Sequence, residues 1–215
     1  MKIKHHLKTL YHKLKYFINL NPYKEYQYSP INIFKPLPNE AIEKLKIVLK
    51  DFEKIENLNV RVSDGTLLGI LREKKLIDHD NDIDFDVEWN EEAEKNIKLN
   101  AKKYNWKMIR KVFYNHKVQQ LTYFDSEEVI FDFIFWMTDE RFAISFCEPG
   151  FYRVMEAKYL KDLKKFVLNQ SVFLIPEDEI GWLKFRYGEN WNVPQSTKKD
   201  WKDDCGDLGV AWWLR

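Results

Sequence analysis

Five aspartates alternate with other residues between positions 78 and 86, in the stretch IDHDNDIDFDV. In an extended strand, successive side chains point to opposite faces. The two faces would hold Asp82, Asp84 and Asp86 on one side and Ile83, Phe85 and Val87 on the other. This alternation predicts a half-buried strand over residues 83–87 with one carboxylate face and one core face, which constrains the fold more than any other feature.

Neighbouring carboxylates on that face either meet a cation or repel each other. Alternate residues lie about 6.5–7 Å apart along a strand, close enough for Asp82 and Asp84 to turn toward one ion. Without an ion they would raise each other's proton affinity, and a hard divalent cation removes that repulsion. We therefore predict a site for Mg²⁺ or Mn²⁺ at Asp82 and Asp84, with Asp80 as a further ligand or support. Asp86 is expected to lie past the site, solvated or salt-bridged.

Two other interpretations of the acidic stretch stay open on the sequence. A charge run can simply form the solvated face of a strand and bind nothing. The spacing of acids from Asp80 to Glu91 also matches the ligand positions of an EF-hand calcium loop. That loop requires glycine at its sixth position for a sharp turn, and this chain has Phe85 there in a strand rhythm.

A further carboxylate, Asp132, stands inside the apolar stretch VIFDFIFW at residues 129–136. An ionised group in such a strand is costly to bury without a partner. On a strand beside the first, Asp132 would be another metal ligand or the base that accepts a proton from an attacking hydroxyl. The alternative is an aspartate at a strand end that is bonded to a neighbouring amide. We predict Asp82, Asp84 and Asp132 as the catalytic residues.

The turn SDGT at residues 63–66 is predicted to join a short strand to a helix over residues 66–74. Backbone N–H groups at such a helix start can bind a phosphate, and an arginine two turns along could grip its oxygens. Glycine is common in turns of this kind, so the turn alone indicates little. Beside two acidic strands it indicates metal-assisted phosphoryl transfer. The residues expected to bind substrate here are Ser63, Gly65, Thr66 and Arg72.

The remaining pattern predicts strands interspersed with helices. Helices are expected from Ile42 to Phe52, capped by Asn39, and over residues 91–104 and 176–187, with Gly188 at the C-terminal cap. Further strands are expected over residues 60–62, 106–110, 118–124 and 129–136, with an edge strand at 142–146 and a mixed, helical pattern after Pro149. The chain is thus predicted to adopt an α+β (mixed α/β) fold, a mixed sheet flanked by helices with a helical C-terminal part.

The first 20 residues carry five lysines and no acid, with apolar residues at steps of three and four. This favours an amphipathic helix that lies on an anionic membrane surface or packs on the protein itself. Four prolines punctuate residues 21–38, which we interpret as a connector. Residues 1–38 would then precede a catalytic domain at residues 39–215.

Charge and cysteine content restrict the partners and the compartment. The 35 basic residues balance 34 acidic ones, which gives no support to a nucleic-acid partner. Two cysteines without metal-ligand spacing indicate a reducing compartment. No apolar run approaches the roughly 18–20 residues that span a bilayer, and no secretory signal is found. We expect a cytoplasmic protein, peripheral at the inner face of the cell membrane if residues 1–20 bind lipid.

Three blocks of the chain resemble the LicD/fukutin family. Residues 65–87, GTLLGILREKKLIDHDNDIDFDV, resemble its signature, which reads roughly GT-L-G-x-x-R and then a run ending in I-P-W-D-x-D-I-D. FDFIF around Asp132 is similar to the family's later acidic strand. YGENWNVP at residues 187–194 is similar to its Y-G-x-x-W-x-x-P stretch. The likeness spans residues 41–194, with the blocks in the expected order.

The resemblance implies a nucleotidyltransferase-like fold. It also implies transfer of a phospho-alcohol, phosphocholine or a polyol phosphate, from a CDP-activated donor to a sugar hydroxyl, with release of CMP. The glycan acceptor would be a cell-surface polysaccharide or lipopolysaccharide. A nucleotidyltransferase that attaches a nucleotide to a small-molecule hydroxyl, and a non-catalytic glycan-binding relic, stay open as alternatives. The positions that match the family's motifs are Asp80, Asp82, Asp84 and Asp132 for the acids and Gly65, Thr66 and Arg72 for the phosphate side.

Three positions depart from the family's pattern. His79 stands where tryptophan is common, Asp78 where proline is common and Glu73 where histidine is common. These differences leave the metal-binding candidates unchanged but bear on donor or acceptor preference, so His79 is predicted to contact substrate. Tyr187 and Trp191 are predicted to stack on a sugar or a base, although aromatic residues are also common in cores.

Overall fold

A mixed nine-stranded sheet forms the body of the protein. The structure, a computed structural model, describes residues 23–27, 35–38, 40–56, 58–147, 151–194 and 208–210. The predicted helix at residues 1–20 lies outside these ranges. Strands β1, β4, β5, β6, β3 and β2 follow one another across the sheet, and the far end of β6 also pairs with β7, which leads to β8 and β11.

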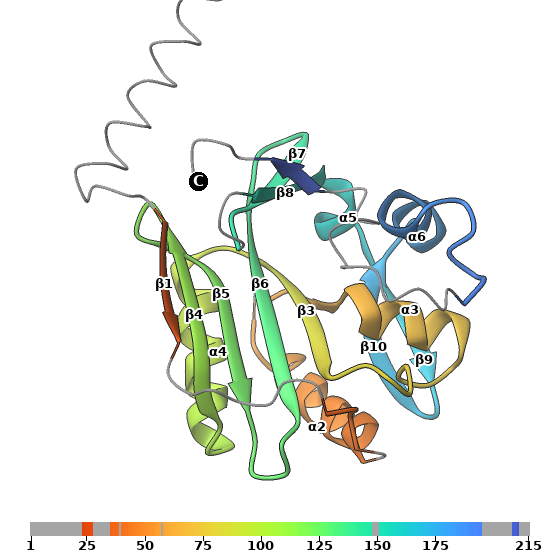
Figure 1. Ribbon diagram of the computed structural model, residues 1–215, viewed down its shortest axis with the longest axis horizontal. Helices are drawn as coiled ribbons and strands as arrows, with labels where there is room; N and C mark the ends of the chain where they lie inside the picture. The colour runs from red at the N-terminus through yellow and green to blue at the C-terminus, as the bar shows by residue number, and fades with distance from the viewer. Residues whose placement is uncertain are drawn as a thin grey trace, which may run out of the picture.

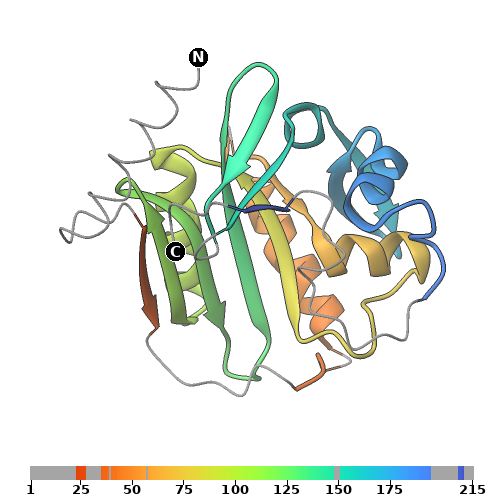
Figure 2. The same cartoon turned by 45° about the horizontal axis from the view of Figure 1, so that its top comes forward.

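The strands of this sheet have the following bounds: β1 (Tyr23–Gln27), β2 (Val60–Val62), β3 (Asp82–Glu88), β4 (Lys107–Tyr114), β5 (Lys117–Phe124), β6 (Ile130–Thr138), β7 (Phe142–Ser145), β8 (Phe151–Glu156) and β11 (Leu208–Val210). A separate hairpin consists of β9 (Leu163–Leu168) and β10 (Ser171–Pro176). The helices are α2 (Ala41–Phe52), α3 (Asp64–Arg72), α4 (Glu91–Lys103), α5 (Lys158–Lys161) and α6 (Glu179–Tyr187). Helices α2 and α4 cover one face of the sheet, while α3 and α6 lie on the side of β3 that faces away from β6 (Figures 1 and 2).

Strand β3 has the two faces that its sequence predicts. Ile83, Phe85 and Val87 are fully buried, and the Phe85 ring stacks on Phe133 of β6 at 4.8 Å between centroids. β3 runs parallel to the apolar strand β6, so burial on both sides of β6 explains its almost continuous hydrophobic sequence. Residues 82–88 form a strand, which shows that the calcium-loop alternative is wrong.

The α+β prediction is confirmed, as are most of the predicted helices and strands before residue 140. Helix α6 ends where predicted, with Gly188 at its C-terminal cap and a φ of 84°. At α2 the cap position belongs to Glu40, whose side chain makes no capping hydrogen bond, and Asn39 lies outside the described residues. Helix α3 begins at Asp64, two residues earlier than predicted. None of the described helices is long and apolar enough to cross a membrane.

Three predictions about the sheet are wrong. The connector predicted for residues 21–38 contains β1, which pairs antiparallel with β4 from Tyr23 to Gln27. The stretch after Pro149 is mainly strands, because β8 extends the sheet and β9 and β10 form a hairpin before α6. Strand β7 is therefore not an edge strand: it lies between β6 and β8.

Candidate active site

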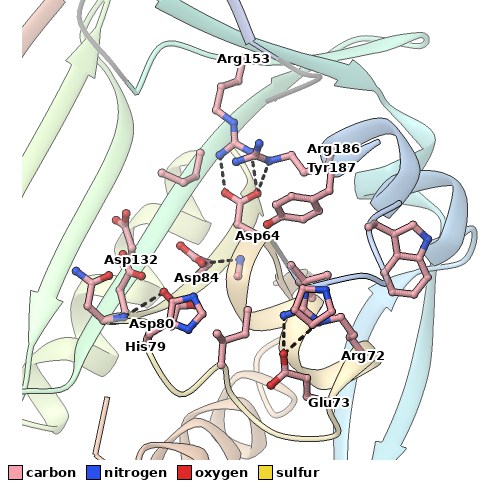
Figure 3. Close-up of a pocket in the computed structure, with 18 of the residues that line it drawn as sticks. Asp64, Arg72, Glu73, His79, Asp80, Asp84, Asp132, Arg153, Arg186 and Tyr187 are labelled. Carbon is pink, nitrogen blue, oxygen red and sulfur yellow. Dashed lines mark hydrogen bonds and ion pairs between the residues drawn. The ribbon is translucent and has the colours of Figure 1, made fainter. Parts of the chain in front are cut away.

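A cavity of about 1230 Å³ lies between the start of α3, the acidic end of β3 and the segment that follows α6. In Figure 3, Asp80, Asp84 and Asp132 lie to one side of the view, and Arg72 and Tyr187 lie to the other. The predicted site residues that line this cavity are Gly65, Arg72, His79, Asp80, Asp82, Asp84, Asp132, Tyr187 and Trp191. These residues were predicted from strand alternation and from the family's motifs, and in the structure they line the same cavity.

Asp80, Asp82 and Asp84 form a compact carboxylate group. One oxygen of each lies within 4.8 Å of the others, which is close enough for a single metal ion to contact all three. All three side chains are partly buried. The ion pairs found among the described residues include none to these three carboxylates, whereas Asp64 and Asp86 beside them are both paired with arginine.

These three carboxyl groups have raised pKa values. Burial raises the pKa of Asp82 well above its ordinary value, and the charges of Asp80 and Asp132 raise it further. Burial, and then the charges of Asp82 and Asp64, raise the pKa of Asp84 in the same way. The pKa of Asp80 is also raised, chiefly by burial. A group of carboxylates that resist ionising together has to bind protons or a cation.

The turn at residues 63–66 holds Asp84 by three of its polar groups. The Gly65 N–H donates to Asp84 Oδ2 at 3.1 Å, and the Ser63 N–H donates to the Asp84 carbonyl at 3.0 Å. The Asp84 N–H in turn donates to Thr66 Oγ1 at 2.9 Å. Ser63 and Thr66 are buried and do not line the cavity. The hydrogen bonds described for Ser63 and Thr66 position the backbone of Asp84, and their contact with substrate stays a prediction.

Asp132 lies on β6, directly opposite Asp84 on β3. Gln120 Nε2 donates to its Oδ2 at 2.6 Å, and Thr122 Oγ1 donates to its Oδ1 at 2.8 Å. The Asp132 carboxylate therefore has the amide partner that the alternative interpretation required, and it also lines the cavity as the third residue of β6. The two hydrogen bonds fix its orientation and are compatible with a ligand or a base.

Arg72 and His79 lie on the wall and rim of the cavity. Arg72 Nη2 pairs with Glu73 Oε1 at 2.5 Å. To contact a phosphate as predicted, the Arg72 guanidinium would have to leave Glu73 or bind both groups at once. His79 is exposed on the loop before β3. The aromatic residues Tyr187 and Trp191 are half-buried at the end of α6 and just beyond it, where they face the cavity.

Two buried arginine–aspartate clusters lie beside the acidic group; the sequence left open that Asp86 is salt-bridged but indicated none of the arginines. Asp86 is fully buried, pairs with Arg61 and accepts a hydrogen bond from Trp136 Nε1 at 2.7 Å, so it is salt-bridged and not solvated. Asp64 accepts hydrogen bonds from Arg153 and Arg186. Burial alone would raise the pKa of Asp64, but the two guanidinium charges hold it below its ordinary value.

A family model described as LicD/FKTN/FKRP, nucleotidyltransferase domain, matches residues 57–178. The chain belongs to this family. The matched range contains Asp80, Asp82, Asp84 and Asp132 and ends one residue before α6. Membership of this family indicates a transferase. The comparison with curated proteins gives no match.

Proposed function

We propose that this LicD-family protein transfers a phospho-alcohol, phosphocholine or a polyol phosphate, from a CDP-activated donor to a sugar hydroxyl of a cell-surface polysaccharide or lipopolysaccharide. CMP is the product released. The observation that carries the proposal is the group of Asp80, Asp82 and Asp84, which combines clustered oxygen donors, raised pKa values and the absence of an ion pair among the described residues. Family membership supports the same class of reaction.

The donor atoms at this site fit Mg²⁺ or Mn²⁺. Both ions prefer oxygen ligands, and three carboxylates that can approach one point supply them. Asp82 and Asp84 would hold the ion, with Asp80 as a further ligand. A bound divalent cation would supply positive charge that offsets the negative charge growing on the departing CMP.

The protein's own residues would orient both substrates. Asp132, fixed by Gln120 and Thr122, would accept the proton of the acceptor hydroxyl or complete the metal site. Arg72 would contact donor phosphate oxygens, and Tyr187 and Trp191 would stack on a base or a sugar. The cavity, at about 1230 Å³, exceeds the ~300–1,000 Å³ of typical small-molecule pockets. It therefore has room for a nucleotide donor and part of an acceptor.

Product analysis tests the proposal. The protein is incubated with Mg²⁺, with CDP-choline, CDP-ribitol or each nucleoside triphosphate, and with a set of sugar acceptors. We expect release of CMP from a CDP-alcohol and coupled labelling of the sugar. Release of pyrophosphate from a triphosphate, with a nucleotide attached to the acceptor, would instead identify the related nucleotidyltransferase reaction and overturn the proposal.

A further inference from the structure

Asp64 stands in the turn that holds Asp84 but turns its own carboxylate toward two arginines (Figure 3). Its φ of 38° is in the left-handed region, which residues other than glycine rarely adopt. The next residue, Gly65, donates its N–H to Asp84 Oδ2. Whatever fixes the backbone of Asp64 therefore also fixes the direction of a hydrogen bond to a metal-ligand candidate.

Arg153 and Arg186 hold the Asp64 carboxylate from two elements distant in sequence. Arg153 on β8 donates from Nη1 to Oδ2 at 2.8 Å and from Nη2 to Oδ1 at 2.9 Å. Arg186 on α6 donates from Nε to Oδ1 at 2.9 Å. Both arginines are almost fully buried. A bidentate guanidinium contact fixes the angle as well as the distance of a carboxylate, so residues of β8 and α6 orient the Asp64 carboxylate.

We propose that Asp64 is a positioning residue: the cluster of Asp64, Arg153 and Arg186 holds the left-handed turn that presents the Gly65 N–H to Asp84. The inference rests on the proposed function, because it assigns to the cluster an effect on metal binding and transfer. Residues that orient metal ligands typically change metal affinity or activity by about 10- to 100-fold when they are replaced. A purely structural ion pair would have no such effect in the folded protein.

The proposal also gives α6 a part in the site. The family match ends at residue 178, and Arg186 lies beyond it on α6. The Arg186 guanidinium lies 5.1 Å from the Tyr187 ring, and that of Arg153 lies 5.1 Å from the Trp136 ring. These aromatic contacts hold the guanidinium groups in place. The segment after the matched range would therefore complete the acidic site.

A second buried pair provides a matched control. Arg61 and Asp86 are both fully buried, and Arg61 packs over the Trp182 ring at 4.8 Å. Neither residue lines the cavity, and neither makes a described hydrogen bond to Gly65. Replacing Arg61 thus disturbs a buried ion pair of the same type that has no described hydrogen bond to residues 63–66.

The test compares Asp64→Asn, Arg186→Lys and Arg153→Lys with the control Arg61→Lys in the full chain. Lysine keeps the charge but cannot reproduce the geometry of a guanidinium fork. Two quantities are measured under conditions where each variant is folded by circular dichroism. They are the Mn²⁺ dissociation constant by calorimetry and the exchange rate of the Gly65 amide hydrogen by NMR.

We expect the three cluster variants to weaken Mn²⁺ binding by about 10- to 100-fold and to speed Gly65 exchange, while Arg61→Lys changes neither. If the cluster variants match Arg61→Lys in both quantities, the inference is wrong. Neither measurement requires a substrate. A wild-type protein that binds Mn²⁺ but transfers no phospho-alcohol would therefore overturn the proposed function, and the cluster variants would still decide this inference.

Discussion

Asp84 and Asp132 lie directly opposite each other on the parallel strands β3 and β6, yet their carboxylates have different partners. Asp84 accepts from the Gly65 N–H of the α3 turn, and Asp132 accepts from the Gln120 and Thr122 side chains of β5. The pairing brings a metal-ligand candidate and a candidate base to the same level of the sheet. Because different residues donate hydrogen bonds to the two carboxylates, a substitution can displace one carboxylate and leave the other in place.

We expect Asp82→Asn and Asp84→Asn to abolish transfer while the fold stays intact. Loss of a supporting partner of a metal ligand already costs about 10- to 100-fold, so loss of a ligand should lower turnover more than about 100-fold. Each substitution also removes one of several repelling buried carboxylates. The metal-free variants should therefore melt at or above the wild-type temperature. Turnover is measured with saturating Mg²⁺ and thermal unfolding without it.

Asp78→Asn is the control for the stability of these variants. Asp78 belongs to the same acidic stretch, but its side chain is 77% exposed and pairs with Lys75 at the surface. A surface pair of this kind contributes little, so this variant should melt like the wild-type protein. Wild-type turnover by Asp82→Asn or Asp84→Asn would show that the acidic strand does not carry the reaction.

The raised pKa values of Asp82 and Asp84 predict that the metal-free protein loses stability as the pH rises. In the unfolded chain these carboxyls titrate near 3.8, and in the folded protein they titrate higher. Between the two values the folded protein binds more protons, so the free energy of unfolding falls as pH increases. Asp64 acts in the opposite direction, because its lowered pKa means that its stabilising contribution is lost only as pH falls below 3.8.

A divalent cation should reverse this loss, because it binds the ionised carboxylates and competes with protons. We expect Mg²⁺ to raise the melting temperature more at about pH 7.5 than at about pH 5, since binding to the native state stabilises it. Thermal unfolding with Mg²⁺ and with EDTA at both pH values measures the difference. An equal effect of Mg²⁺ at the two values would contradict a site formed by carboxylates of raised pKa.

Gly65→Ala should impair metal binding directly. A Cβ at this position would lie 2.3 Å from Asp80 Oδ2 and 3.5 Å from Asp84 Oδ2, so the Asp80 carboxylate has to move. Gly69→Ala, one turn along the same helix, provides the comparison, because its Cβ would lie 2.6 Å from the Lys75 carbonyl oxygen. We expect Gly69→Ala to lower stability by about 1–3 kcal/mol with Mn²⁺ affinity retained, and Gly65→Ala to weaken Mn²⁺ binding. The reverse outcome would refute the geometry of the turn.

Membrane contact through residues 1–20 is tested by deletion. The lysines and apolar spacing of this segment predict attraction to anionic headgroups. Removal of residues 1–20 should abolish partition onto vesicles that contain phosphatidylglycerol and leave Mn²⁺ affinity unchanged. Unchanged partition of the shortened protein in sedimentation assays would rule out this segment as the membrane contact.

The acidic site could be predicted from the sequence because its pattern is local. Side chains two residues apart share a face of any strand, so Asp82 and Asp84 needed no knowledge of the strand's partners. Asp132 was predictable for a related reason, since a carboxylate within an apolar strand requires a polar environment. The shared register of Asp84 and Asp132 required the fold.

The cluster of Asp64, Arg153 and Arg186 could not be predicted in this way. Arg153 and Arg186 lie 89 and 122 residues from Asp64 in the chain, and no local pattern marks either of them as its partner. The one local signal was Asp64 itself, an acid in a turn where its backbone has to be left-handed. Aspartate is among the few residues that tolerate this conformation.

The missed strands have physical explanations of their own. β1 has the sequence YKEYQ without β-branched residues, so its strand conformation depends on pairing with β4. The β9–β10 hairpin turns at Asn169 and Gln170, with φ values of 49° and 64°. Two-residue turns of this type usually have the sequence Asn-Gly. This turn has glutamine in the second position, so its sequence does not match the usual hairpin pattern.

The most direct test of the central claim is to locate Mn²⁺ in crystals of the protein by its anomalous scattering. The account predicts a peak in the cavity at about 2.1 Å from carboxylate oxygens of Asp82 and Asp84, and none there in crystals of Asp84→Asn. A wild-type protein with no peak beside these residues, at a Mn²⁺ concentration that supports full activity, would contradict it.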